Sequence, residues 1–144
     1  MANFTTESTV RTKFQLTDPA LVPTDLVAAS IDDAHLELLR FLDPDLDTAS
    51  PPSALIMGET LLAGAHLFRS LASKHAFEQK QVVVGGQRIE AGQRFAALSA
   101  IATLAEDNAW YLLEPYLAAG RPRVPAAATD TAPILGAPRT NGGQ

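Results

Sequence analysis

The feature that most constrains the fold is a long apolar segment, Ser53 to Phe77, in which only Gly58 and Gly64 interrupt good helix formers. Its apolar side chains occupy nearly the whole circumference of a helix instead of a single stripe. A helix that is apolar on all sides lies at the buried centre of a bundle. We therefore predict one central helix with other helices around it, and we expect the small residues to let a neighbouring helix approach closely.

Three further helices are expected to pack around the central one, because apolar residues recur at helical spacing in three more segments. Pro115 should kink or weaken the end of the last of them. The 144 residues fit one domain, and 47% of them are hydrophobic, which is enough for a core at this size. The expected helices run from Thr6 or Ser8 to Phe14, from Thr24 to about Leu42 and from about Gly92 to Leu117, and the central helix has Ser50 as its N-cap and Pro51 in its first turn.

A strand-like stretch, KQVVVGGQRIE at 80–90, connects the last two helices. The three valines at 82–84 favour a strand, and Gly85-Gly86 is typical of a two-residue hairpin turn. The residues at 87–89 would then form the returning strand. An isolated hairpin is marginally stable in water, so this one should pack on the bundle or on a neighbouring molecule.

The last 25 residues differ in composition from the rest of the chain, since about half of them are Ala, Pro or Gly. Such a segment buries too little apolar surface to form a core and is typical of an extended tail. The predicted fold is therefore mainly α, a small bundle of three to four helices with a short β-hairpin or extended loop between the last two long helices. The helical domain spans 1–119 and the tail spans 120–144.

Acidic and basic residues lie in different parts of the chain, whose formal net charge is −5. A net negative charge argues against sequence-specific DNA binding, which depends on a basic face. An acidic end and a basic end on one small body suit head-to-tail self-association, and two solvated faces are the alternative. Residues 25–47 contain Asp25, Asp32, Asp33, Glu37, Asp43, Asp45 and Asp47 with only Arg40, whereas 69–94 contain Arg69, Lys74, Lys80, Arg88 and Arg94 with Glu78 and Glu90.

Candidate chemistry is sparse. His35 shares a helical face with Asp32, but a metal site in a bundle needs a second ligand pair with Glu-x-x-His spacing, and none is visible. His66 is expected to be a hydrogen-bonded polar group beside the buried stripe, and His75 lies in a last helical turn, where a cation is favoured. The chain contains no cysteine, no nucleophile elbow and no phosphate-binding loop. We therefore predict no catalytic residue, no metal and no cofactor.

The block at 53–102, together with RFLDPDLD at 40–47, resembles the head-tail connector (adaptor, or head-completion) proteins of long-tailed bacteriophages. Those proteins have a short N-terminal helix, an acidic helix ending in an LDP-like turn, a long alanine-rich helix, a loop or hairpin, and a last long helix. The resemblance covers roughly residues 7–117. The tail from Gly120 is not part of it.

The resemblance implies a virion structural protein at the head-tail junction, made in the host cytoplasm. Usually twelve copies of such a protein form a ring beneath the portal, extend the DNA channel and help to retain the packaged double-stranded DNA. The implied partners are further copies of the chain, the portal, and a stopper, tail terminator or other tail protein. The hairpin would contact a neighbour or the channel, and the tail would reach the portal. The implied interface residues are Asp32, Asp33, Glu37, Val83, Gln87, Arg88, Arg94, Arg121 and Arg123.

Three other interpretations stay open at this point. A stopper or tail terminator is less favoured, because those neck proteins rely on β-sheets. A cellular helical binding or regulatory module would be a stable monomer or dimer. A small helical enzyme using His35 and its acidic neighbours is the least favoured.

Overall fold

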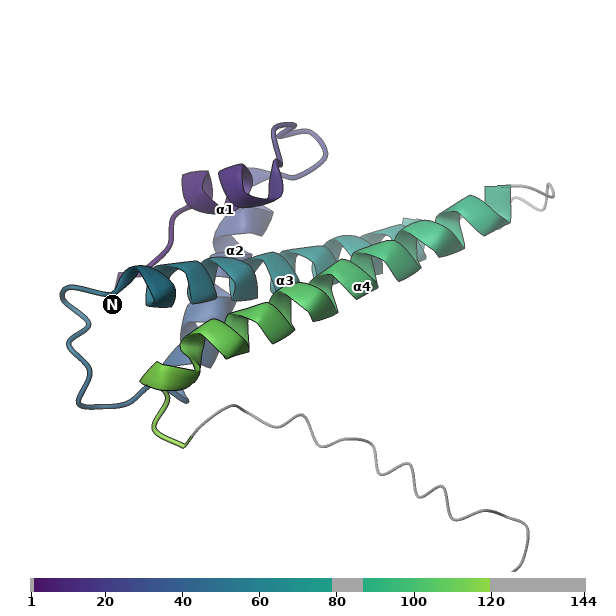
Figure 1. The fold of residues 1–144 in the computed structure, drawn as a ribbon. Coiled ribbons are helices and arrows are strands. Elements are labelled where there is room, and N and C mark those ends of the chain that lie inside the picture. Colours follow the sequence, from purple (N-terminus) through teal and green to yellow (C-terminus); the bar gives the residue numbers. More distant parts are fainter. Residues whose placement is uncertain (1, 79–86, 120–144) are drawn as a thin grey trace, which may run out of the picture.

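Four α-helices pack as a bundle in the computed structural model, which describes residues 2–78 and 87–119 (Figure 1). The mainly α fold class is confirmed for these residues, among which no β-strand occurs. No helix in the described ranges is long and apolar enough to cross a membrane. The elements are α1 (Glu7–Phe14), α2 (Thr24–Leu39), α3 (Ser53–Glu78), α4 (Gln87–Leu113) and the short 3₁₀ helix η1 (Glu114–Tyr116).

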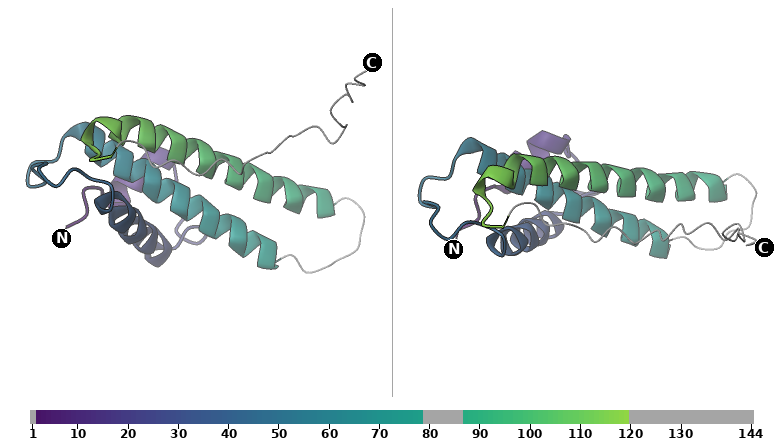
Figure 2. Two further views of the ribbon diagram at one scale, coloured as in Figure 1. Left: turned by 90° about the horizontal axis from the view of Figure 1, so that it is seen from below. Right: turned by 60° about the horizontal axis from the view of Figure 1, so that its bottom comes forward.

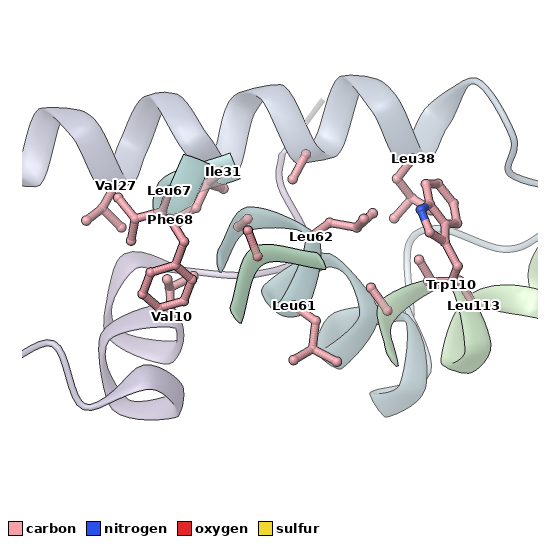
Figure 3. Close-up of a cluster of buried hydrophobic side chains, with 14 of the residues drawn as sticks. Val10, Val27, Ile31, Leu38, Leu61, Leu62, Leu67, Phe68, Trp110 and Leu113 are labelled. Atoms are coloured by element: carbon pink, nitrogen blue, oxygen red, sulfur yellow. The ribbon is translucent and has the colours of Figure 1, made fainter. Parts of the chain in front are cut away.

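The central position predicted for the long apolar helix is confirmed. α3 packs against α1, α2 and α4, and in the two views of Figure 2 it lies between α2 and α4. Apolar side chains from all four helices meet along it (Figure 3). The fully buried members of this core include Val10 of α1, Leu38 of α2, Leu62 and Leu67 of α3, and Leu113 of α4.

Both glycines of α3 lie where another element approaches closely. A Cβ atom placed on Gly58 would lie 2.5 Å from Cδ2 of Leu113, and one placed on Gly64 would overlap the ring of Phe14. The Phe14 ring also packs edge-on against Phe68, with 5.1 Å between ring centroids. α4 therefore approaches α3 at Gly58, and α1 approaches it at Gly64, which confirms the prediction drawn from the small residues.

Local sequence signals fix the start of α1 and the end of α4. Thr6 caps α1, since its hydroxyl accepts a hydrogen bond from the Thr9 amide at 3.2 Å, and Gln15 ends the helix in a left-handed conformation. The predicted cap of α3 at Ser50 is wrong, because the helix begins at Ser53 and the Pro52 carbonyl accepts its first hydrogen bonds. α4 gives way to a 3₁₀ turn at Glu114, as the following Pro115 predicts.

The predicted returning strand at 87–89 is wrong, because these residues form the first turn of α4. The physical reason is that a hairpin without a sheet to join leaves many backbone groups unpaired, whereas extending a helix pairs one more group per residue. The rest of the predicted hairpin, including Val83, lies outside the described residues, as does the tail from Gly120. α2 also ends earlier than expected, at Leu39 instead of Leu42.

The end of α2 is tied to the end of the helical body. The Asp43 amide donates to the Tyr116 carbonyl at 2.9 Å, and the Ala118 amide donates to the Phe41 carbonyl at 3.0 Å. The ring of Phe41 packs edge-on against Trp110. The C-terminal end of α4, which η1 follows, therefore lies at the opposite end of the α3–α4 pair from the place where α3 ends and α4 begins (Figure 1). The 26 residues of α3 separate those two ends by about 39 Å.

Candidate interaction surfaces and a buried polar cluster

A buried polar cluster joins α2, α3 and the segment before α1. The carboxylate of Glu59 in α3 is fully buried, and its two oxygens bond the Thr5 amide and Nδ1 of His35, each at 2.5 Å. The hydroxyl groups of Thr5 and Thr60 lie 2.7 Å apart. The ring of Phe4 packs edge-on against the His35 ring, with 5.1 Å between centroids. The N-terminal segment therefore contributes a backbone amide and an aromatic ring to the surroundings of this buried histidine–glutamate pair.

A second histidine–glutamate pair joins the same two helices near the surface. Nε2 of His66 in α3 lies 2.7 Å from Oε2 of Glu37 in α2, and both side chains are about 30% exposed. The hydrogen bond from Glu37 raises the pKa of His66 above its ordinary value of 6.5, with a smaller contribution from Asp33, while burial and Arg69 oppose the rise. This histidine is thus a hydrogen-bonded polar group, as predicted from its place beside the buried stripe.

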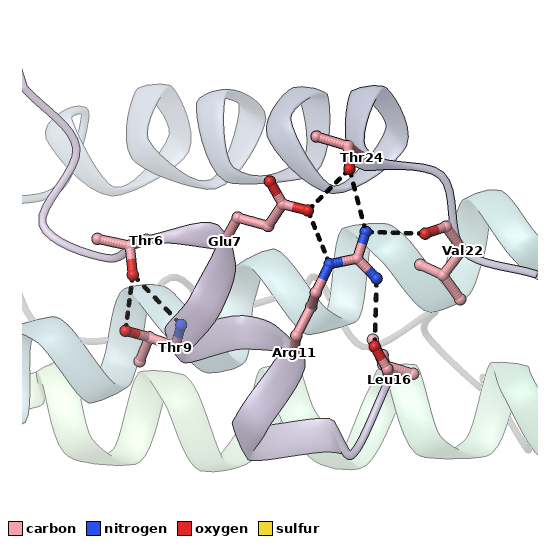
Figure 4. Close-up of polar contacts among 7 residues, drawn as sticks. All are labelled: Thr6, Glu7, Thr9, Arg11, Leu16, Val22 and Thr24. Carbon is pink, nitrogen blue, oxygen red and sulfur yellow. Dashed lines mark hydrogen bonds and ion pairs between the residues drawn. The ribbon is translucent and has the colours of Figure 1, made fainter. Parts of the chain in front are cut away.

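A third polar cluster fixes α1 against the start of α2 (Figure 4). The guanidinium group of Arg11 donates to Glu7 at 2.7 Å and to the backbone carbonyls of Leu16 and Val22 at 3.2 and 2.9 Å. The Thr24 hydroxyl donates to the same Glu7 oxygen at 3.0 Å. These bonds from Arg11 and Thr24 hold the pKa of Glu7 below its usual value. One arginine of α1 therefore binds both ends of the segment that connects the two helices.

The acidic residues predicted at an interface lie on α2, but they do not behave alike. Asp32 and Asp33 are exposed, and Asp32 accepts a hydrogen bond from the Asn3 side chain at 2.8 Å. Glu37 is half-buried and already engages His66 of its own chain. We define the α2 outer face by its exposed residues Asp25, Ala28, Ala29, Asp32, Asp33 and Leu36.

The basic residues predicted at the interface are scattered. Gln87 and Arg88 lie in the first turn of α4, and Arg94 lies exposed two turns further along the same helix. Arg121 and Arg123 lie outside the described residues. Sequence reasoning did not identify the exposed face of α4 on which Arg94 lies. We define the α4 outer stripe by the exposed residues Arg94, Ala97, Ile101, Leu104, Asn108 and Tyr111, which alternate at spacings of three and four.

The one candidate catalytic histidine has different partners from those the sequence indicated. His35 is only 4% exposed and bonds Glu59, whereas Asp32 faces outward and bonds Asn3. The two residues predicted to share a helical face therefore do not form one site. Within residues 2–78 and 87–119, no group of three His, Cys, Asp or Glu side chains is placed to hold a metal ion.

Sequence reasoning did not identify Glu59 or Thr5. The available signal was a single carboxylate within the apolar segment LIMGETLLAGAHLF, because a charged residue in a buried helix needs a partner inside the protein. Its partner His35 lies 24 residues away on another helix, and no local pattern links the two positions. Comparisons with protein-family models, with curated proteins and with solved structures gave no match for this chain.

Proposed function

We propose that this chain is a virion structural protein, a head-tail connector of a long-tailed bacteriophage. On this proposal about twelve copies form a ring between the portal and the tail, extend the DNA channel and help to retain packaged DNA. The proposal rests on the resemblance at 40–47 and 53–102 together with the helical architecture. Its partners are the portal on one side and a stopper, tail terminator or other tail protein on the other.

The observation that carries the proposal is the placement of the two unusual sequence segments. Residues 79–86 join α3 and α4 at one end of the long helix pair, and the helical body leads into the tail sequence at 120–144 at the other end, about 39 Å away. A subunit that bridges two different rings needs two contact regions separated along its length. We propose the tail as the arm that binds the portal, and the α3–α4 end as the region that borders the channel or the neighbouring subunit.

The charge of the chain supports the same role. A net charge of −5 disfavours tight binding to the phosphates of double-stranded DNA, so genomic DNA can pass a ring of such subunits without being held at specific sites. The acidic residues exposed on α2 and the exposed Arg94 on α4 provide opposite charges for contacts between copies.

The direct test is removal of the protein from the phage that encodes it. Without a connector, heads should package DNA and then lose it, and tails should accumulate unattached. The readouts are nuclease-protected DNA per head and electron microscopy of free heads and tails. Infectious particles with a normal DNA content in its absence would overturn the proposal.

A cellular helical binding module is the second candidate, and one observation favours it. On the α4 outer stripe the described part of the chain leaves Ile101, Leu104 and Tyr111 partly exposed, and such apolar side chains can serve a helical partner. In that case the protein forms a stable monomer or dimer that does not bind a portal ring.

A further inference from the structure

A short non-helical segment precedes α1 and docks on α2 and α3. We call it the N-terminal strap and define it as Asn3, Phe4 and Thr5. The Asn3 side chain donates a hydrogen bond to Asp32 of α2 at 2.8 Å, and the Phe4 ring packs edge-on against the ring of His35. The Thr5 amide donates to Oε2 of Glu59 in α3 at 2.5 Å. The strap therefore makes its contacts with α2 and α3.

The hydroxyl of Thr5 makes a further bond to α3, and its direction follows from the number of protons. The Thr5 and Thr60 hydroxyl oxygens lie 2.7 Å apart. The Thr60 hydroxyl donates its one proton to the Ile56 carbonyl, at 2.7 Å, so Thr5 is the donor to Thr60. Thr5 thus gives both of its donors to α3. Removing the Thr5 hydroxyl would leave the bond from Thr60 to Ile56 intact.

α1 is anchored by different contacts. Val10 is fully buried, Phe14 packs on α3, and Arg11 bonds two carbonyls of the segment that leads to α2. The exposed Thr6 stands between the strap and α1 and accepts hydrogen bonds from the amides of Thr9 and Val10. Within the described residues, no hydrogen bond joins the strap to α1. The strap can therefore leave its site while α1 stays in place, with Thr6 as the hinge.

Two features of the docked strap favour its opening. Nε2 of His35 is buried and has no hydrogen-bond partner among the described residues, so it gains a bond when water reaches it. Asn3 and Phe4 are only partly buried, whereas α1 contributes the fully buried Val10 to the core. Segments with few buried apolar contacts open at a lower free energy than the rest of a fold. The strap should therefore open more often than α1.

Opening of the strap would bring solvent to the buried pair. The Thr5 nitrogen lies 2.5 Å from the Glu59 carboxylate, and the Phe4 ring centroid lies 5.1 Å from that of His35. Withdrawing the strap therefore vacates space in direct contact with both side chains of the pair. That space is continuous with solvent, because the Asn3 and Phe4 side chains that fill its outer part are themselves partly exposed.

We propose that the N-terminal strap opens and closes about Thr6 independently of α1, and so controls the access of solvent and solutes to the buried Glu59–His35 pair. The closed strap supplies a backbone N–H to the carboxylate and an aromatic ring to the imidazole. The open strap leaves both groups to water. The inference does not depend on the connector function, because every contact that carries it lies within one chain.

Amide hydrogen exchange of the full chain, measured by NMR, tests whether strap and α1 open separately. Thr5 and Val10 are both buried, and both amides are hydrogen-bonded, so the two sites are comparable. After correction for intrinsic rates, the Thr5 amide should be at least about tenfold less protected than the Val10 amide.

Two variants should separate the two openings. Thr5→Val removes the bond to Thr60 and should speed exchange at position 5 by about threefold to tenfold while leaving Val10 unchanged. Arg11→Met should speed exchange at Val10 and leave position 5 unchanged. Ser8→Ala, an exposed change on α1, is the control and should alter neither.

Acylation of histidines by diethyl pyrocarbonate, located by mass spectrometry, tests access to the pair. His66 and His75 are less buried than His35 and serve as internal references. His35 should react more slowly than both, through its unbonded Nε2. Thr5→Val should speed the reaction of His35 by the same factor as the exchange at position 5, and should leave the two references unchanged.

The inference is overturned if Thr5 and Val10 of the wild type exchange with the same opening free energy, because strap and α1 then open as one unit. Acceleration of both amides by either variant would have the same meaning. It is also overturned if His35 reacts as fast as the references, since the pair is then accessible with the strap in place, or if Thr5→Val leaves the rate at His35 unchanged.

Discussion

Replacing Glu59 with alanine should destabilise the protein far more than replacing Glu37 with alanine. Both glutamates pair with a histidine across the same two helices, α2 and α3. They differ in burial, since Glu59 is fully buried and the Glu37 side chain is 30% exposed. The comparison therefore isolates the effect of burial on one type of polar pair.

The magnitudes follow from the groups left without partners. Glu59→Ala strands the Thr5 amide and Nδ1 of His35, whose Nε2 atom is already buried without a hydrogen-bond partner. Removing one member of a buried pair costs about 3–5 kcal/mol of the free energy of unfolding. Glu37→Ala leaves His66 able to reach water and should cost about 0–1 kcal/mol. Because domains of this size have a total stability of about 5–15 kcal/mol, the first loss is large.

Urea unfolding followed by circular dichroism measures both values, with the slope of the transition confirming that the same surface is exposed in each variant. The double variant His35→Leu/Glu59→Leu should recover part of the loss, since apolar groups of similar size tolerate burial, although the Thr5 amide stays unpaired. Equal losses for Glu59→Ala and Glu37→Ala, within about 1 kcal/mol, would refute the account of this cluster.

Three further predictions follow from the packing and the surface pairs. His66→Gln should lower the free energy of unfolding most at mildly acidic pH. Because the pKa of His66 is raised in the folded protein, its stabilisation is present below about pH 6.5 and is lost as the pH rises through the folded pKa. In urea unfolding, the difference in stability between wild type and variant should therefore be about 1 kcal/mol or less and should shrink toward about pH 8. Gly64→Ala should destabilise the protein by about 1–3 kcal/mol, because the new methyl group overlaps the Phe14 ring. Adding Phe14→Leu should recover part of that loss. If Gly64→Ala instead stabilises the protein, as it does on an exposed helix, the close packing of α1 on α3 is contradicted. Arg11→Met should lower the free energy of unfolding by about 2 kcal/mol and speed amide hydrogen exchange in α1, because it removes the bonds to the Leu16 and Val22 carbonyls. Lys13→Met removes an exposed charge from the same helix and should change neither the stability nor the exchange rate.

The sequence predicted the helices well where the physical signal is local. Thr6 begins α1 because a hydroxyl caps a helix through a residue three positions away, and Pro115 ends α4 because its ring clashes with the preceding turn. The apolar circumference of 53–77 predicted a central helix because burial on all sides leaves no room for a polar face. Each of these arguments needs only neighbours along one helix.

The sequence failed where the outcome depends on partners distant in the chain. Val82–Val84 and the glycine pair favoured a hairpin by propensity, but residues 87–89 form the first turn of α4, since a helix needs no second strand to pair its backbone. The bond between His35 and Glu59 joins positions on different helices, and the packing of α2 against α3 brings them together. The α4 outer stripe was not predicted for a similar reason. Its apolar residues recur at helical spacing whether they face α3 or solvent.

The measurement that tests the central claim most directly is the mass of the purified protein in solution, alone and then mixed with the portal ring of the same phage. The account predicts that the protein joins the portal as a symmetric ring and that a chain ending at residue 119 binds the portal more weakly. A stable monomer or dimer that does not bind the portal at any concentration would contradict the connector function and favour the helical binding module.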